Sequence, residues 1–136
     1  MNYIIKKYNA YCESEILPLY ESVGWTNYTS NPRMLERAYN NSLCTFAAYV
    51  DGNVVGIVRA VGDGASLVFV QDLLVSPQYQ RQGIGSALLI ALAKEYKDVY
   101  QFQLVTDNTD KNIAFYKSLG FATGKELGCE FLMKVK

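Results

Sequence analysis

A glycine-containing loop is the segment of this sequence whose residues most clearly predict chemistry. An apolar run ends at Pro77, the polar loop Gln80-Arg81-Gln82-Gly83-Ile84-Gly85 follows, and a strongly apolar segment begins directly after it. This order is typical of a strand, a turn and the start of a helix. The first N–H groups of a helix have no partner inside it and the helix dipole is positive there, which favours an anion such as phosphate. Gly83 and Gly85 let the backbone approach that anion, because neither carries a Cβ.

Two common phosphate-binding motifs do not fit this loop. No Lys-Ser or Lys-Thr pair follows the glycines, as a P-loop requires. Leu88 stands where a dinucleotide-binding fingerprint has its third glycine, and no acidic residue suits the ribose in a clear βαβ setting. A lone Gly-x-Gly is more often an ordinary strand-to-helix turn. The register of strand, proline, loop and helix is what favours a binding site.

Composition excludes several other classes of site. The chain has 136 residues, half of them apolar, which predicts one compact domain over residues 1–136. Its 13 basic and 13 acidic residues cancel, which argues against nucleic acid as a partner. Because there is no histidine, a His base, a His metal ligand and a Ser-His-Asp triad are excluded. Cys12, Cys44 and Cys129 are widely spaced, so we predict no zinc site, no disulfide and a buried thiol at each position.

The sequence gives no indication of a membrane partner or an export signal. The residues that follow Met1 lack the apolar stretch of a signal peptide. The longest apolar segment, Ala87 to Ala93, is far shorter than the roughly 18 residues that a membrane span needs. We therefore expect a cytoplasmic protein in a reducing compartment, with no membrane partner.

Periodicity and turn signals predict an α/β chain with the element order β-α-α-β-β-β-α-β-α-β-β. Asn31-Pro32 is typical of an N-cap and the first residue of a helix, Asp51-Gly52-Asn53 predicts a hairpin turn, and Gly120 is placed to end a helix. The strands are expected at residues 3–8, 45–50, 54–61, 66–75, 99–106, 121–124 and 129–135, and the helices at residues 11–23, 32–43, 86–96 and 111–119.

The loop resembles the Gln/Arg-x-x-Gly-x-Gly/Ala signature of the GNAT acyltransferases, the Gcn5-related N-acetyltransferase superfamily. Gln80 to Gly85 match this signature, and the Leu-x-Val-x-Pro pattern from Leu73 to Pro77 fits as well. Asn112 to Phe121 resembles a second family segment, with an asparagine, an alanine, an aromatic pair and a Gly-Phe. The element order is similar to that of the family over almost the whole chain. The resemblance implies a single-domain GNAT acyltransferase fold, whose mixed central sheet has two splayed strands.

The resemblance also implies a role for each residue that matches a family motif. Leu73 and Val75 offer backbone groups to the pantetheine arm of acetyl-CoA in the gap between the splayed strands, and Asn112 hydrogen-bonds the same arm. Tyr116 protonates the departing thiolate, because a phenol of pKa about 10 can donate to a thiolate whose thiol has a pKa of about 8.5. The alternative for Tyr116 is a core aromatic residue. The residues implied to bind the pyrophosphate are Arg81, Gln82, Gly83, Ile84, Gly85 and Ser86.

Asp72, the only acid on the predicted central strand, is the candidate base. Three roles are open to it: it takes the proton of the amine directly, it takes that proton through a water molecule, or it binds the amine. Strand residues alternate between faces, so Gln71 and Asp72 are expected to point to opposite sides. Some relatives carry a Glu where this chain has Gln71 or Phe69, and neither residue is a base. The alternative for Asp72 is a structural carboxylate that holds the Gly62–Gly64 turn or a nearby N–H. Arg59 is expected to pair with Asp72, to meet an acidic substrate, or to lie on the surface.

Recognition of the acceptor is predicted in the segment Gly24 to Ser30, between the first two helices. Trp25 and Tyr28 there are expected to form an aromatic wall for an amine or an acyl chain. The alternative is that Trp25 closes the core under a long loop.

The whole sequence is therefore interpreted as an N-acetyltransferase that moves an acetyl group from acetyl-CoA to a primary amine by direct attack, without a metal. The amine belongs to a small molecule or a peptide, and a homodimer is compatible with this interpretation. Three alternatives stay open: a non-catalytic regulator that binds acyl-CoA, a protein acetyltransferase acting on N-termini or lysines, and a nucleotide-binding module of another class.

Overall fold

The computed structural model describes residues 2–136. These residues divide into two compact units, one that ends at Gln103 and one that spans Leu104–Lys136. The elements of the first unit are β1 (Ile4–Lys7), α1 (Glu13–Ser22), α2 (Thr26–Thr29), α3 (Pro32–Asn40), β2 (Cys44–Val50), β3 (Asn53–Gly62), β4 (Leu67–Val75), the 3₁₀ turn η1 (Pro77–Tyr79), α4 (Ile84–Glu95) and β5 (Gln101–Leu104), whose last residue begins the second unit. The second unit contains α5 (Asp110–Ser118) and α6 (Gly124–Leu127).

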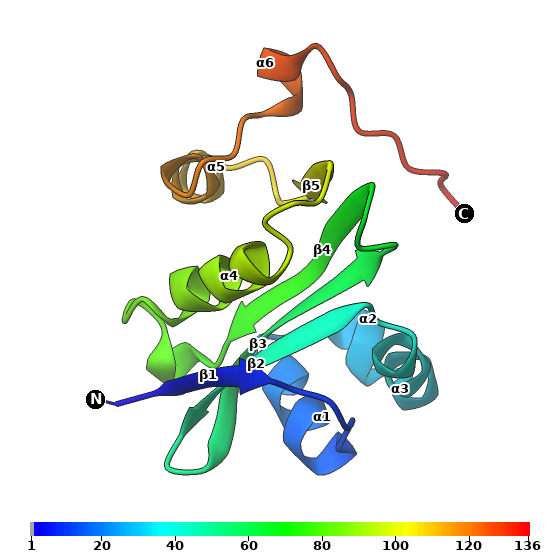
Figure 1. Ribbon diagram of the computed structural model, residues 1–136. Coiled ribbons are helices and arrows are strands. Elements are labelled where there is room, and N and C mark those ends of the chain that lie inside the picture. The colour runs from blue at the N-terminus through cyan, green and yellow to red at the C-terminus, as the bar shows by residue number, and fades with distance from the viewer. Residues whose placement is uncertain (1) are drawn as a thin grey trace. The chain divides into compact units, whose positions relative to one another are not determined.

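A five-stranded sheet in the order β1-β2-β3-β4-β5 forms the centre of the first unit. The first four strands pair antiparallel with their neighbours. At the other edge, the backbone N–H groups of Tyr100 and Gln101 donate to the carbonyls of Ala65 and Ser66 at 3.0 and 2.9 Å. These two bonds join the start of β5 to the residues just before β4. Helices α1, α2 and α3 lie on one side of the sheet and α4 lies on the other (Figure 1).

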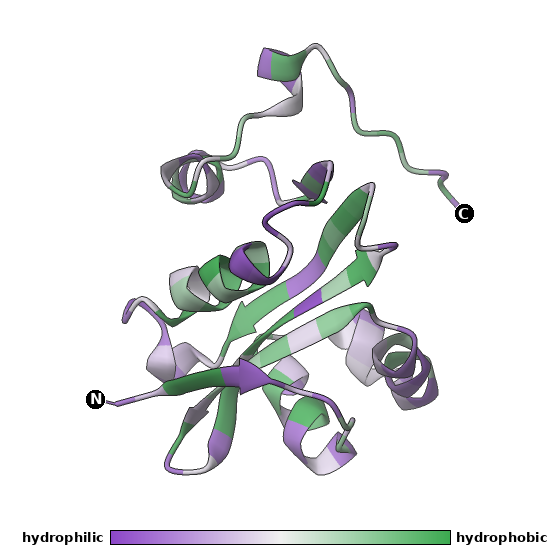
Figure 2. Ribbon diagram, in the orientation of Figure 1, coloured by the Kyte–Doolittle hydropathy of each residue, from purple (hydrophilic) through white to green (hydrophobic). Residues whose placement is uncertain are grey.

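The core of the first unit occupies both faces of this sheet. On one face, Ile16 and Tyr20 of α1 pack with Leu35 of α3 against strand residues such as Ile57. On the other face, α4 buries apolar residues at helical spacing, Ile84, Leu88, Leu89 and Leu92. Figure 2 shows hydrophobic residues along the central strands and along α4. Because both faces are covered, the strands are largely apolar, and a buried charge on them requires a partner.

A β-bulge interrupts the pairing of β3 with β4. Arg59 pairs with Asp72, whereas the next residue, Ala60, pairs with Val70. Gln71 therefore has no partner in β3. A bulge adds one residue to a strand and changes the direction of the side chains beside it. The strict alternation that predicts Gln71 and Asp72 on opposite faces fails at this point.

Local signals for turns and helix ends are confirmed. Asn31 caps α3, with its side chain accepting a hydrogen bond from the N–H of Met34 at 3.3 Å. Asp51 and Gly52, between β2 and β3, both have positive φ angles, 51° and 81°, as a type I′ hairpin turn requires. Gly120, with φ 96°, follows the C-cap of α5.

The end of the chain departs from the sequence prediction. The α/β class is confirmed, and so is the order of the predicted elements as far as α5, with the short helix α2 in addition. The strand expected at residues 121–124 is wrong. Thr123 and Glu126 form a capping box there and start the short helix α6. Residues 129–135 form neither a strand nor a helix. An apolar segment becomes a strand only where a neighbouring strand supplies hydrogen bonds, and the described residues give this segment no such partner.

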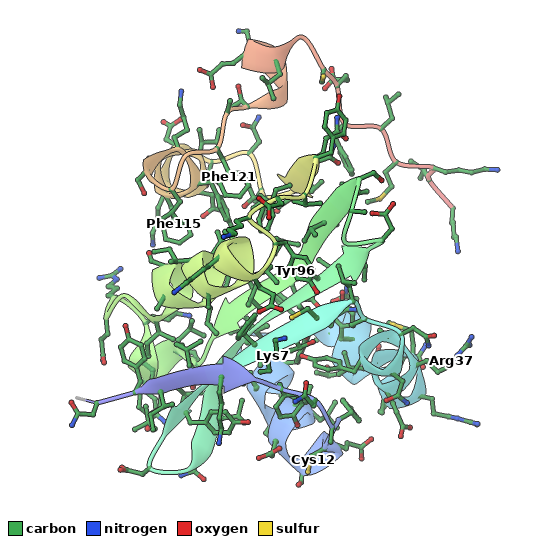
Figure 3. The ribbon with its side chains drawn as sticks, viewed as in Figure 1. Lys7, Cys12, Arg37, Tyr96, Phe115 and Phe121 are labelled. Carbon is green, nitrogen blue, oxygen red and sulfur yellow. The ribbon has the colours of Figure 1, made fainter. Side chains whose placement is uncertain are left out.

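Two other expectations are corrected. The segment Gly24 to Ser30, for which no regular element is expected, contains the single turn of α2. Burial of the cysteines is wrong for Cys12 and Cys129, which are exposed, while Cys44 is partly buried, and all three are free. Figure 3 shows Cys12 at the outside of the molecule near the start of α1, the helix that it precedes as N-cap.

Candidate active site

The glycine loop lies where the sequence predicts it, between the end of β4 and the start of α4. The side chain of Gln80 donates from Nε2 to the carbonyl of Val75 at 2.9 Å and so ties the loop to the end of the strand. Arg81 and Gly83 both have positive φ angles, 65° and 83°. Gly83 is the N-cap of α4, and its left-handed conformation is the one that glycine adopts at little cost. The helix begins at Ile84, two residues earlier than predicted.

The N-terminus of α4 has free hydrogen-bond donors. No side chain caps it, and its first turn contains no acidic residue. The first bond inside the helix runs from the N–H of Ala87 to the carbonyl of Gly83, at 3.0 Å. The N–H groups of Ile84, Gly85 and Ser86 therefore have no acceptor within the helix. Together with the dipole of this 12-residue helix and the exposed guanidinium of Arg81, they suit a phosphate group.

Asp72 lies at the centre of a buried polar cluster, which we call the Asp72 cluster and which consists of Tyr20, Tyr28, Tyr39, Arg59 and Asp72. The side chains of Arg59 and Asp72 are 4% and 3% exposed. Arg59 Nε and the hydroxyl of Tyr20 both donate to Asp72 Oδ2 at 2.8 Å, and the hydroxyl of Tyr28 donates to Oδ1 at 2.8 Å. Both carboxylate oxygens are thus occupied. Of the alternatives for Arg59, pairing with Asp72 is the one that the structure confirms.

The Asp72 cluster joins all three N-terminal helices to the sheet. Tyr20 comes from α1, Tyr28 from α2 and Tyr39 from α3, and the hydroxyls of Tyr20 and Tyr39 lie 3.0 Å apart. Arg59 Nη1 also donates to the carbonyl of Ala38 at 3.4 Å, near the end of α3. Burial, followed by the charge of Asp72, raises the pKa of Tyr28. Burial likewise raises the pKa values of Tyr20 and Tyr39 well above that of an exposed tyrosine.

These contacts bear on the alternatives for Asp72. The Gly62–Gly64 turn is held by Asp63 instead, whose Oδ1 accepts from the N–H groups of Ala65, Ser66 and Leu67. The side-chain hydrogen bond of Ser66 and these backbone donors lower the pKa of Asp63. Three donors fill the carboxylate of Asp72, an arrangement typical of a structural group. A role as base stays a prediction.

The predicted acceptor residues lie side by side but differ in burial. Tyr28 is 8% exposed and belongs to the core, whereas Trp25 is only partly buried and packs at the edge of it. Their ring centroids are 6.3 Å apart, and that of Trp25 is 5.8 Å from Tyr20. Trp25 thus closes the core on one side while part of its ring stays accessible.

A separate groove of about 360 Å³ runs beside α1. It is lined from α1, from the start of β3 and from the segment after β4, with polar side chains that include Glu15, Asn53 and Gln78. None of the residues that the sequence predicts for the site lines it.

The second unit holds the remaining predicted residues on α5. Thr109 caps this helix, because its Oγ1 accepts from the N–H of Asn112 at 3.2 Å. Tyr116 is partly buried, with its ring 5.0 Å from that of Phe115 and 5.8 Å from that of Phe121. Burial raises the pKa of Tyr116, and a side-chain hydrogen bond of Thr106 offsets part of this effect. The phenol therefore keeps its proton at neutral pH.

Sequence reasoning missed three residues of this region. Tyr20 and Tyr39 were expected only as helical residues, and their hydroxyls reach the Asp72 cluster through tertiary packing. Gln71 was expected to face away from Asp72, yet its Nε2 lies 3.5 Å from the hydroxyl of Tyr28. An arginine and an aspartate on neighbouring apolar strands were the only signal for this cluster.

Residues 2–136 contain neither a metal-binding cluster nor a membrane-spanning helix. No group of three or more His, Cys, Asp or Glu side chains is arranged to hold a metal ion. No helix in the same range is long and apolar enough to cross a membrane.

Comparison with known proteins identifies relatives over most of the chain. The family model described as "Acetyltransferase (GNAT) family" matches residues 8–121. A GNAT-family acetyltransferase from Streptococcus pneumoniae is 44% identical, with a TM-score of 0.91 over 99% of this chain and 98% of that chain. The PaiA N-acetyltransferase from Thermoplasma acidophilum, solved in complex with coenzyme A, is 19% identical and has a TM-score of 0.72 over 90% of this chain and 91% of that chain, which shows the fold alone.

The curated relatives are longer than this chain. The uncharacterized N-acetyltransferase ycf52 of Gracilaria tenuistipitata is 29% identical over 123 residues, which are 85% of this chain and 65% of that protein. The chain spans 65% or less of the length of the curated relatives that it matches first.

Proposed function

This chain belongs to the GNAT acetyltransferase family, and from that premise we propose that it transfers an acetyl group from acetyl-CoA to a primary amine by direct attack. The observation that carries the proposal is the uncapped N-terminus of α4 behind the glycine loop. Free N–H groups and a helix dipole lie there without a competing acid, and the exposed Arg81 precedes the helix by three residues. Because the chain belongs to this family, we propose that the anion bound there is the pyrophosphate of acetyl-CoA.

The proposed cofactor contacts follow the chain from β4 into α4. The backbone from Arg81 to Ser86 binds the pyrophosphate, and the backbone groups of Leu73 and Val75 pair with the pantetheine arm. Asn112 hydrogen-bonds the same arm. Support for the first contact is geometric, and support for the other two is the family resemblance.

In the proposed reaction the amine nitrogen attacks the thioester carbonyl, the carbon–sulfur bond breaks, and CoA leaves as a thiolate. Tyr116 donates its phenolic proton to that sulfur. The amine loses one proton as the amide forms. Because three donors occupy the carboxylate of Asp72, we assign this proton to water, which returns one to Tyr116.

For the acceptor, we propose an amine with an aromatic or aliphatic body. The accessible part of Trp25 offers one apolar wall, and Tyr28 supports it from the core. Polyamines are expected to be poor substrates, since the segment around Trp25 carries no carboxylate and the net charge of the chain is zero.

CoA release measured with a panel of amines and peptides tests this proposal. We expect turnover with at least one apolar primary amine and competition by CoA but not by ATP or NAD. The occupied carboxylate of Asp72 favours one alternative, a module that binds acyl-CoA without turnover. Tight CoA binding with no release across the panel would support that alternative. Turnover confined to peptides would support a protein acetyltransferase.

A further inference from the structure

We propose that Gln71 receives the acceptor amine, and that Tyr28 and Arg59 are positioning residues that fix the direction of its carboxamide. In this assignment Gln71 Oε1 accepts a hydrogen bond from an N–H of the amine. The inference rests on the proposed function, because it names a contact of the same acceptor site.

The bulge in β4 places Gln71 where a ligand can reach it. The residue has no partner in β3, and its side chain is exposed. Even so, it is turned to the same side as Asp72, since Gln71 Nε2 and Asp72 Oδ1 lie 3.5 and 2.8 Å from the same hydroxyl, that of Tyr28. Gln71 therefore lies beside the buried Asp72 cluster, on its solvent-exposed side.

A count of protons fixes which way the amide faces. The hydroxyl of Tyr28 has one hydrogen, and it goes to Asp72 Oδ1, a carboxylate oxygen that only accepts. The oxygen of Tyr28 can then only accept further bonds. It does so from Arg59 Nη2 at 3.4 Å and from Gln71 Nε2 at 3.5 Å. If the amide were flipped, two oxygens would face each other without a proton, so Oε1 points away from Tyr28.

An outward carbonyl oxygen suits a neutral amine about to react. It accepts one N–H and leaves the nitrogen lone pair free to attack. A carboxylate at the same place would instead stabilise the protonated ammonium, which has no lone pair. The charges of Arg59 and Asp72 cancel each other, so nothing in the Asp72 cluster favours the cation either. We therefore assign an acceptor that is largely neutral near pH 8, such as an aromatic amine or an α-amino group of pKa about 8 next to an apolar side chain.

The test compares Gln71→Leu, Tyr28→Phe and the double variant in steady-state kinetics, with each substrate varied in turn. The probes are aniline, phenylalanine amide, hexylamine and spermidine. We expect Gln71→Leu to raise the KM of the best amine about three- to tenfold, the worth of one hydrogen bond, and to leave the KM of acetyl-CoA unchanged. Tyr28→Phe frees the amide to rotate and should raise the same KM. The double variant should be no worse than Gln71→Leu alone, because both changes remove one contact.

Two controls keep the result specific. Gln78→Leu removes another exposed glutamine, outside the bulge, and should change neither KM. Gln71→Glu should shift the preference toward hexylamine, an amine that is protonated at neutral pH. Melting temperatures confirm that Tyr28→Phe is folded.

Additive effects of the two single changes, or equal effects on both substrates, would overturn the assignment. Failure of the proposed function would give a different result, because the wild-type protein would then turn over none of the amines. In that case, calorimetric titration of phenylalanine amide into the CoA-saturated protein decides the inference separately. Weaker binding by Gln71→Leu supports it, and equal binding or no binding by the wild-type protein overturns it.

Discussion

Asp72 and Arg59 form an ion pair in which each group has little access to water, so its loss should affect folding more than catalysis. Replacing Asp72 with Asn leaves the guanidinium of Arg59 buried without a counter-charge. Breaking such a pair costs about 3–5 kcal/mol in the free energy of unfolding. We expect Asp72→Asn to lower the melting temperature strongly while the specific activity of the folded fraction at low temperature is kept.

Asp98→Asn, at an exposed position, is the matched control and should change neither quantity. The opposite pattern, a normal melting temperature with a large fall in kcat/KM, would establish Asp72 as a base or an amine-binding group.

Tyr116 is the residue whose hydroxyl is expected to matter for turnover alone. Its pKa is raised by burial, so it holds a proton to donate across the neutral range. We expect Tyr116→Phe to lower kcat about 10²–10⁴-fold, with little change in CoA affinity measured by calorimetry. Tyr100→Phe, at a residue that is 80% exposed, serves as control. Normal turnover by Tyr116→Phe at every pH tested would show that Tyr116 is not the acid and only packs in the core.

At the scale of an element, the N-terminus of α4 offers a clean test of charge. Asp and Asn have nearly the same shape, both tolerate the left-handed conformation of Gly83, and both can cap a helix. Only Asp brings a negative charge toward the pyrophosphate. We expect Gly83→Asp to bind CoA at least about tenfold more weakly than Gly83→Asn, since like charges a few ångströms apart repel by more than 1.4 kcal/mol near a protein surface. Equal CoA affinities of the two variants in calorimetry would show that the pyrophosphate does not bind at the N-terminus of α4.

Elements were predictable from the sequence where their signals are local. The Asn31-Pro32 cap, the Asp51-Gly52 turn and Gly120 each act within a few residues, so sequence alone places them. The bulge at Gln71 has no such signal, because it depends on how β3 and β4 align across the sheet. The same holds for the Asp72 cluster, whose members join three helices and two strands. At the C-terminus, the apolar residues within 129–135 favour a strand, but they cannot supply the hydrogen-bonding neighbour that a strand requires.

At the scale of the whole molecule, the three buried tyrosines of the Asp72 cluster tie stability to alkaline pH. Burial raises their pKa values above the value of about 10 that they have when unfolded. A group whose pKa is higher in the folded state contributes stability that is complete below pH 10 and is lost as the pH rises further. We expect the melting temperature to fall above about pH 10, and these tyrosines to ionise only when the chain unfolds.

The tyrosinate absorbance measured together with circular dichroism checks this expectation. A folded protein in which every tyrosine titrates near pH 10 would contradict it. The variant Tyr39→Phe should make the fall in melting temperature less steep, because one fewer buried phenol then releases a proton on unfolding.

The order of residues in the Asp72 cluster also bears on how the protein is made. Tyr20, Tyr28, Tyr39 and Arg59 all precede Asp72 in the chain, by as many as 52 residues, so during synthesis four partners leave the ribosome before the carboxylate that unites them. Until then the guanidinium of Arg59 has no counter-charge to accompany it into the core, and burying it alone is costly. We expect the nascent N-terminal helices to stay loosely packed and open to chaperones until Asp72 emerges. We therefore expect the helices to pack on the sheet only after Asp72 has been synthesised.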